Sequence, residues 1–175
     1  MMEGVEALAI AIESTEGLLL RFLEDVEDDA RTAQAAGLPN HFIWTLGHCA
    51  MTMHKLASKI DGQLPPETDF MQGDGTGGDP ERFDTEAVCK GSSPTPEASL
   101  YPNMERGRAI YSKACHRLAG AVRGLDPGAL KATRDWNGTP IPLLDLVLRV
   151  SFHNGVHAGQ VLDLRRALNM PRIIG

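Results

Sequence analysis

The sequence predicts an all-α protein, specifically an up-down four-helix bundle with a long Gly/Pro-rich loop between its second and third helices. Three observations support this fold class. Apolar residues recur at spacings of three, four and seven over four segments, which is the period of a buried helix face. Val and Ile do not alternate with polar residues over any useful length, so no strand is indicated. Proline and glycine gather at the expected helix ends and in residues 61–100.

The first two helices are expected in residues 3–36 and 41–60. Gly37, Leu38 and Pro39 follow the first segment and stop it, because glycine and proline end helices. Asn40 is a favoured N-cap residue for the second helix.

The third helix is expected in residues 102–123, with Pro102 in its first turn. A short polar connection, residues 129–138, should follow. Thr139 is then the expected cap of a fourth helix that has Pro140 at its first position and reaches residue 169.

Residues 61–100 have loop composition, with runs of Gly, Pro, Ser and Asp. A connection of this length could be a linker between two domains. Neither side of it has enough helices to form a core, so we expect one domain over residues 1–175 with a loop excursion at about 61–100.

Composition excludes several classes of protein. The chain has 175 residues and a net charge of −6, with Lys and Arg scattered, so a nucleic-acid partner is not expected. No apolar stretch approaches the ~18 residues of a membrane span. The acidic first residues differ from a secretion signal, which predicts a cytoplasmic protein without a membrane partner. The three cysteines are expected to be free thiols.

Two histidines in the fourth helix suggest a metal site. His153 and His157 are four residues apart, so they share one face of a helix and can bind the same ion. Gln160 continues that face. A third ligand should come from a facing helix, and His48, one turn after Trp44, is the best candidate. The alternative is that these histidines are polar residues near the core that bind nothing.

His41 lies seven residues before His48, about 10 Å along the same helix face. It could line the mouth of a pocket together with Trp44 and Gln160, or it could be exposed at the start of the helix. Asn154 stands where a zinc peptidase motif needs Glu, so a peptidase is not indicated. No candidate histidine has Glu three residues before it, as a di-iron site would require.

Three motifs resemble those of the DinB-like superfamily of four-helix bundles. They are WTLGH at 44–48, HNGVHAGQ at 153–160, and RRAL at 165–168 with Pro171 beyond. The resemblance implies three metal-binding histidines, which map to His48, His153 and His157. It also implies one divalent ion, zinc or nickel, and homodimers. Some members of the superfamily transfer or isomerise substrates with a low-molecular-weight thiol.

Three functional hypotheses follow. The first is a metal-dependent enzyme, a thiol-dependent transferase or isomerase or a hydrolase, acting on a small-molecule substrate. The second is a non-catalytic bundle that binds metal or a small ligand. The third is a structural bundle whose histidines bind nothing, for which the thermal midpoint would be indifferent to a chelator.

Overall fold

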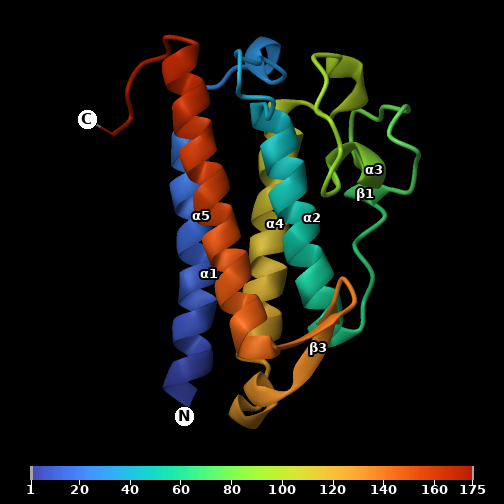
Figure 1. Ribbon diagram of the computed structural model, residues 1–175, viewed down its shortest axis with the longest axis vertical. Helices are drawn as coiled ribbons and strands as arrows, with labels where there is room; N and C mark the ends of the chain where they lie inside the picture. Colours follow the sequence, from blue (N-terminus) through green and yellow to red (C-terminus); the bar gives the residue numbers. More distant parts are fainter. Residues whose placement is uncertain (1, 175) are drawn as a thin grey trace.

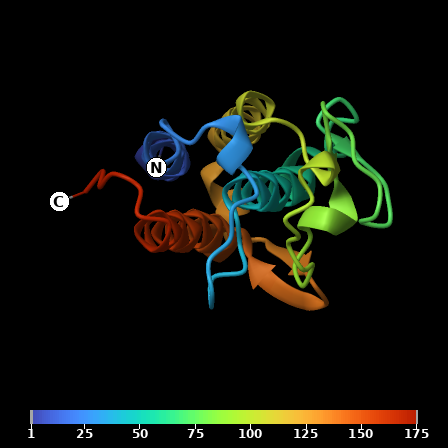
Figure 2. The same ribbon diagram turned by 90° about the horizontal axis from the view of Figure 1, so that it is seen from above.

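The computed structural model describes residues 2–174, which are mostly helical. The long helices of this part are α1 (Met2–Phe22), α2 (Phe42–Asp61), α4 (Met104–Arg123) and α5 (Leu143–Ala167). They run side by side (Figure 1), and α1 and α2 each pack against both α4 and α5. Viewed from the end, α1 and α2 stand on opposite sides of the group (Figure 2). The expectation of a largely helical chain is confirmed.

The core lies between these helices. Apolar side chains at helical spacing are removed from water on each inner face, and each fully buried one contributes roughly 1.5–3 kcal/mol. On α4 they include Ile110, Tyr111, Ala114, Cys115, Leu118 and Val122. None of the helices within residues 2–174 is both long and apolar enough to cross a bilayer.

The first helix is shorter than predicted. It ends at Phe22 rather than at residue 36, and a turn and the 3-10 helix η1 (Asp28–Ala30) follow. Leu23 and Val26 are nevertheless buried, because the turn folds them into the core. Arg108 of α4 donates hydrogen bonds to their carbonyl oxygens, at 2.6 and 2.7 Å. The helical spacing of apolar residues therefore extends past the end of the helix, which explains why the helix was predicted too long. The hydrogen bonds from Arg108 that end it come from a residue far along the chain, so the local sequence gives no sign of them.

The N-cap of the second helix lies one residue later than predicted. His41, not Asn40, is the N-cap: its Nδ1 accepts a hydrogen bond from the backbone N–H of Trp44 at 3.2 Å. At the other end Gly62 adopts φ +73°, the left-handed conformation that closes many helices.

The long connection after α2 is folded against the helices. It contains the short parallel strands β1 (Phe70–Met71) and β2 (Phe83–Asp84), the helix α3 (Thr85–Val88) and the 3-10 helix η2 (Ala98–Leu100). This segment lies on the outer side of α2 in Figures 1 and 2. Sequence composition alone indicated only a loop, because elements of two to four residues leave no periodic signal.

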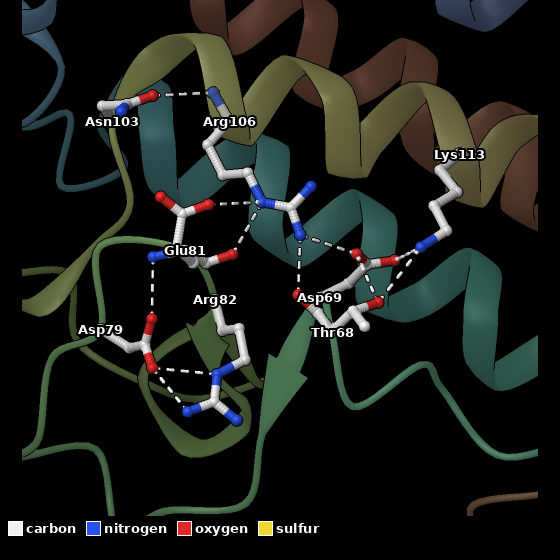
Figure 3. Close-up of polar contacts among 8 residues, drawn as sticks. All are labelled: Thr68, Asp69, Asp79, Glu81, Arg82, Asn103, Arg106 and Lys113. Carbon is white, nitrogen blue, oxygen red and sulfur yellow. Dashed lines mark hydrogen bonds and ion pairs between the residues drawn. The ribbon is translucent and has the colours of Figure 1, made fainter.

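Ion pairs attach this connection to α4 (Figure 3). Asp69 is fully buried and lies 2.9 Å from Arg106 Nη2 and 2.8 Å from Lys113 Nζ. Arg106 also donates to the carbonyl oxygens of Thr68 and Glu81, at 2.7 and 2.8 Å. A buried carboxylate needs such partners to offset its desolvation, so these contacts fix the path of the connection beside α2.

A β-hairpin stands where a polar connection and the start of the fourth helix were predicted. Strand β3 (Thr133–Trp136) pairs antiparallel with β4 (Thr139–Pro142). The turn residues Asn137 and Gly138 have φ of 55° and 82°, as expected for an Asn-Gly hairpin turn. That turn signal outweighed the capping pattern of Thr139 and Pro140, so α5 begins at Leu143. It ends at Ala167, two residues before the predicted end.

Candidate metal centre

Three imidazole rings from two helices meet at one point. His48 comes from α2, and His153 and His157 come from consecutive turns of α5. Nε2 of His153 lies 3.1 Å from Nε2 of His48 and 3.2 Å from Nε2 of His157. The ligand nitrogens of all three lie within 4.8 Å of one another. The structure thus brings together the three histidines named from the sequence.

A backbone carbonyl orients the His48 ring. Its Nδ1 lies 2.8 Å from the carbonyl oxygen of Val88, at the end of α3. A carbonyl can only accept a hydrogen bond, so Nδ1 carries the proton and Nε2 keeps its lone pair. Trp44 stacks on one face of the ring, with centroids 4.5 Å apart and an angle of 8° between the planes.

A side-chain amide orients the His157 ring in the same way. Its Nδ1 donates to Oε1 of Gln160 at 2.8 Å, and that oxygen also accepts from Nδ2 of Asn40 at 3.1 Å. Nε2 is again left with its lone pair directed at the other histidines. Metal-bound histidines commonly have such a partner for their second nitrogen, which fixes the tautomer.

His153 is held less tightly. Its Nδ1 lies 3.4 Å from Oδ1 of Asn154, which is a long contact. Asn154 is itself fixed, since it is 1% exposed and its Nδ2 donates to Oγ1 of Thr15 at 3.1 Å. This places a buried amide, anchored to α1, behind the ring.

Burial keeps these imidazoles neutral at pH 7. Desolvation is the main cause that lowers the pKa of His48 and of His153, and it lowers the pKa of His157 to about 4. Neutral imidazole is the form that binds metal.

The donor set fits a divalent ion. One proton on Nε2 of His153 could serve only one of its two neighbours well, whereas a cation can accept the lone pairs of all three rings. Zn–N bonds of 2.0–2.1 Å in a tetrahedral site put ligand nitrogens roughly 3.3 Å apart. The separations of 3.1 and 3.2 Å from His153 are close to this value.

A cavity of about 640 Å³ opens beside the histidines. It lies between α2, the segment after α3, the β3–β4 hairpin and α5. Its lining consists of His48, Met51, Thr52, Lys55, Cys89, Lys90, Trp136, Asn137 and His153. A small molecule in this cavity would contact two of the three histidines.

The residues expected to line the pocket lie elsewhere in the site. Trp44 and Gln160 contact the histidine rings from behind, outside this lining. His41 is also outside it: its Nδ1 caps α2 and its Nε2 donates to the carbonyl oxygen of Thr95 at 3.0 Å. Sequence reasoning missed Val88, whose role belongs to a backbone atom, and the hairpin residues. The sequence offered a signal for Asn154, as a polar residue within an apolar helix, and for Met51 and Lys55, which follow His48 at helical spacing.

Comparison with known proteins identifies the family. The family model described as the DinB superfamily matches residues 11–161. The chain belongs to the DinB superfamily. The match covers α2 and the part of α5 up to residue 161, which supply the three histidines of this DinB-superfamily protein.

A solved structure supports the fold. The chain is similar to a conserved protein from Enterococcus faecalis, with a TM-score of 0.64 and 13% sequence identity. The similarity covers 93% of this chain and 95% of that one. At this identity the similarity concerns the fold alone. No curated protein matches the chain.

Proposed function

We propose that this DinB-superfamily protein is a metal-dependent enzyme that acts on a small molecule. His48, His153 and His157 would hold one divalent ion, zinc or nickel. The observation that carries the proposal is the convergence of three Nε2 lone pairs, 3.1 and 3.2 Å apart, beside a cavity of about 640 Å³. Three protein ligands leave a coordination position for substrate, as in catalytic rather than structural zinc sites.

Such an ion, when bound, polarises a substrate oxygen, lowers the pKa of a bound water or binds a thiolate. The chain's own residues orient the ligands and shape the space in front of them. Val88 and Gln160 hold two rings in the required tautomer. Trp44, 5% exposed, excludes water from the back of the site.

The reaction class we favour is transfer or isomerisation with a low-molecular-weight thiol, with hydrolysis as the other enzymatic reading. Among the described residues that line the cavity there is no carboxylate. A thiol bound as thiolate is already a nucleophile, so its reaction needs no protein base at this point. Hydrolysis would have to rely on the metal-bound water itself.

We further propose that the chain forms one domain, an up-down four-helix bundle, and that two copies form a homodimer in the cytoplasm. Large apolar side chains are exposed along one face of α5, four residues apart. They are Leu144, Leu148, Phe152 and Val156, with exposed fractions from 39% to 74%. A second copy could cover this stripe. Sedimentation should give a dimer mass for the unaltered chain and a monomer mass for Phe152→Lys; a monomer in both would contradict the dimer.

A non-catalytic module that binds metal or a small ligand is the second candidate. The lack of an acidic group among the described lining residues also fits this role, because binding needs no proton transfer. The histidines would be the same, so only turnover separates the two.

The test combines metal analysis with turnover. We expect about one divalent ion per chain, and consumption of an electrophile in the presence of a low-molecular-weight thiol that stops when the ion is removed. Turnover that survives complete metal removal would contradict a metal-dependent enzyme. Tight metal binding without turnover over a panel of thiols and electrophiles would favour the binding module.

A further inference from the structure

The cavity beside the three histidines carries positive charge. Lys55 and Lys90 contribute to its lining, and within the described part of the chain no acidic residue does. The whole chain has a net charge of −6, so this region is opposite in sign to the rest of the molecule. A local positive region in an acidic protein attracts anions to one place.

The two lysines differ from the cations of the protein that are held in ion pairs. Arg106, Arg123 and Arg165, for example, are each within 3.0 Å of a carboxylate. Among residues 2–174, no ion pair joins Lys55 or Lys90 to an acidic side chain. The two cations that line the cavity therefore have no counter-charge within the described part of the chain, so both can pair with an anion.

Lys55 is also held in position. Its Nζ donates to Oδ1 of Asn137 at 2.6 Å and lies 5.0 Å from the centre of the Trp136 ring. Both partners belong to the β3–β4 hairpin and both line the cavity. The hairpin thus keeps the ammonium group at the wall of the cavity with neutral contacts that an anion can supplement.

The spacing of His48 and Lys55 along α2 sets the length of a ligand that contacts both. Lys55 is seven residues after His48, so the two lie on one face about 10 Å apart along the axis. Met51 lies between them, and Trp136 provides a flat apolar wall. A ligand that contacts both ends must therefore be elongated, with about 10 Å between its metal-binding atom and its charged group.

We infer that the cavity binds a small organic anion, with its charged end at Lys55 and Lys90 and its apolar body on Met51 and Trp136. The inference deepens the proposed function, on which it rests for the end of the ligand that reaches the histidines. Glu86 stands near this cavity, since its Oε2 lies 3.7 Å from Sγ of Cys89. That carboxylate opposes the binding of an anion on this side of the cavity, so the probes chosen below carry no more than one negative charge.

Two probes that differ only in charge test the inference. We would titrate 6-mercaptohexanoate and 6-mercaptohexanol into zinc-loaded protein by calorimetry. We expect the acid to bind about fivefold more tightly than the alcohol, since exposed ion pairs are worth up to about a factor of five each. The preference should shrink when salt is raised to about 0.5 M. Equal affinities at low salt would overturn the inference.

Charge variants locate the effect. Lys55→Gln and Lys90→Gln should each reduce the preference, and the double variant should abolish it. Lys131→Gln is the matched control, because Lys131 is exposed and outside this lining. Glu86→Gln should increase the affinity for the acid. An undiminished preference in the double variant would overturn the inference.

The readouts separate this inference from the proposed function. Metal content is measured on the same samples, and a protein that cannot be loaded would contradict the metal centre. The same titrations with metal-free protein still compare acid with alcohol at the lysines. In metal-free protein, a preference for the acid that disappears in the double variant supports the anion site. Equal affinities of the unaltered metal-free protein for the acid and the alcohol contradict it.

Discussion

His41 and His48 stand two turns apart on one helix, and the difference between them separates a structural histidine from a ligand. Both are buried, and burial lowers the pKa of both. Both nitrogens of His41 are used by the backbone, one as the cap of α2 and one as donor to Thr95. His48 uses one nitrogen on Val88 and directs the other at His153.

His54, on the same helix, extends the comparison. Burial lowers its pKa to about 4, as for His41. Its Nδ1 accepts from Arg117 at 2.9 Å, and its ring lies edge-on to Phe70. Burial and a lowered pKa are thus common to structural and candidate metal-binding histidines. What distinguishes the site is several unprotonated nitrogens that converge on one point.

The largest expected effect is on metal binding. His153→Ala removes the central ligand, and we expect the affinity for zinc to fall more than about 100-fold, beyond the range of outer-shell changes. His41→Ala should keep the metal and lose about 1 kcal/mol of stability as a lost cap. Calorimetric zinc titration and denaturant unfolding of both variants make the measurement. Equal loss of zinc affinity in the two variants, both folded, would contradict the distinction between a structural histidine and a metal ligand.

A smaller effect is expected from the residue that orients His157. Gln160→Ala removes the acceptor for its Nδ1, and outer-shell changes of this kind cost about 10–100-fold in metal affinity. Asn40→Ala removes only the further contact to Gln160 and should cost less. Competition with a chromophoric chelator would rank the two. An unchanged affinity in Gln160→Ala would mean that this hydrogen bond does not prepare the ligand.

A packing change tests how the carbonyl partner of His48 is placed. A Cβ at Gly47 would lie 2.7 Å from the Phe83 ring and 2.9 Å from Val88 Cγ1. Gly47→Ala should therefore push the α3 segment outward, cost about 1–3 kcal/mol and weaken metal binding. Gly120→Ala, where nothing lies within 4 Å, is the matched control and should stabilise its helix slightly. Thermal unfolding compares them, and similar midpoints would contradict close packing at Gly47.

The smallest expected effect concerns acid stability. The pKa of His41 is lowered to about 4, against about 6.5 in an unfolded chain. Between pH 6.5 and 4 the unfolded state therefore binds a proton that the folded state does not, so stability falls as pH falls. His41→Asn keeps a capping side chain that does not titrate. Between pH 7 and pH 4 this variant should therefore lose less of its free energy of unfolding than the unaltered chain, by on the order of 1–2 kcal/mol. Urea unfolding of metal-free protein measures this; identical pH profiles would contradict it.

Much of the helical framework follows from local sequence. The third helix was expected in residues 102–123 and is found at Met104–Arg123, because its apolar period and its ends are local signals. The end of the first helix and the β3–β4 hairpin were predicted wrongly. In the first case Arg108, far along the chain, caps the carbonyls. In the second, two competing turn signals overlapped at residues 137–140.

The candidate site likewise has a part that could be predicted from local sequence and a part that could not. His48, His153 and His157 could be named from spacing and motif, since helix periodicity fixes which residues share a face. Val88 and the cavity walls could not, because the segment after α2 and the hairpin reach the site through tertiary contacts. Asp69 with Arg106 and Lys113 positions one of these segments, and such a pairing leaves no mark in the local sequence.

X-ray absorption of zinc-loaded protein tests the central claim most directly. The account expects three imidazole nitrogens at about 2.0–2.1 Å and one further light ligand, which a sulfur at about 2.3 Å replaces when a small thiol is added. In His153→Ala the imidazole count should fall. A shell closed by four protein ligands, unchanged by thiol, or a spectrum that is the same in the variant, would contradict a three-histidine centre with an open position.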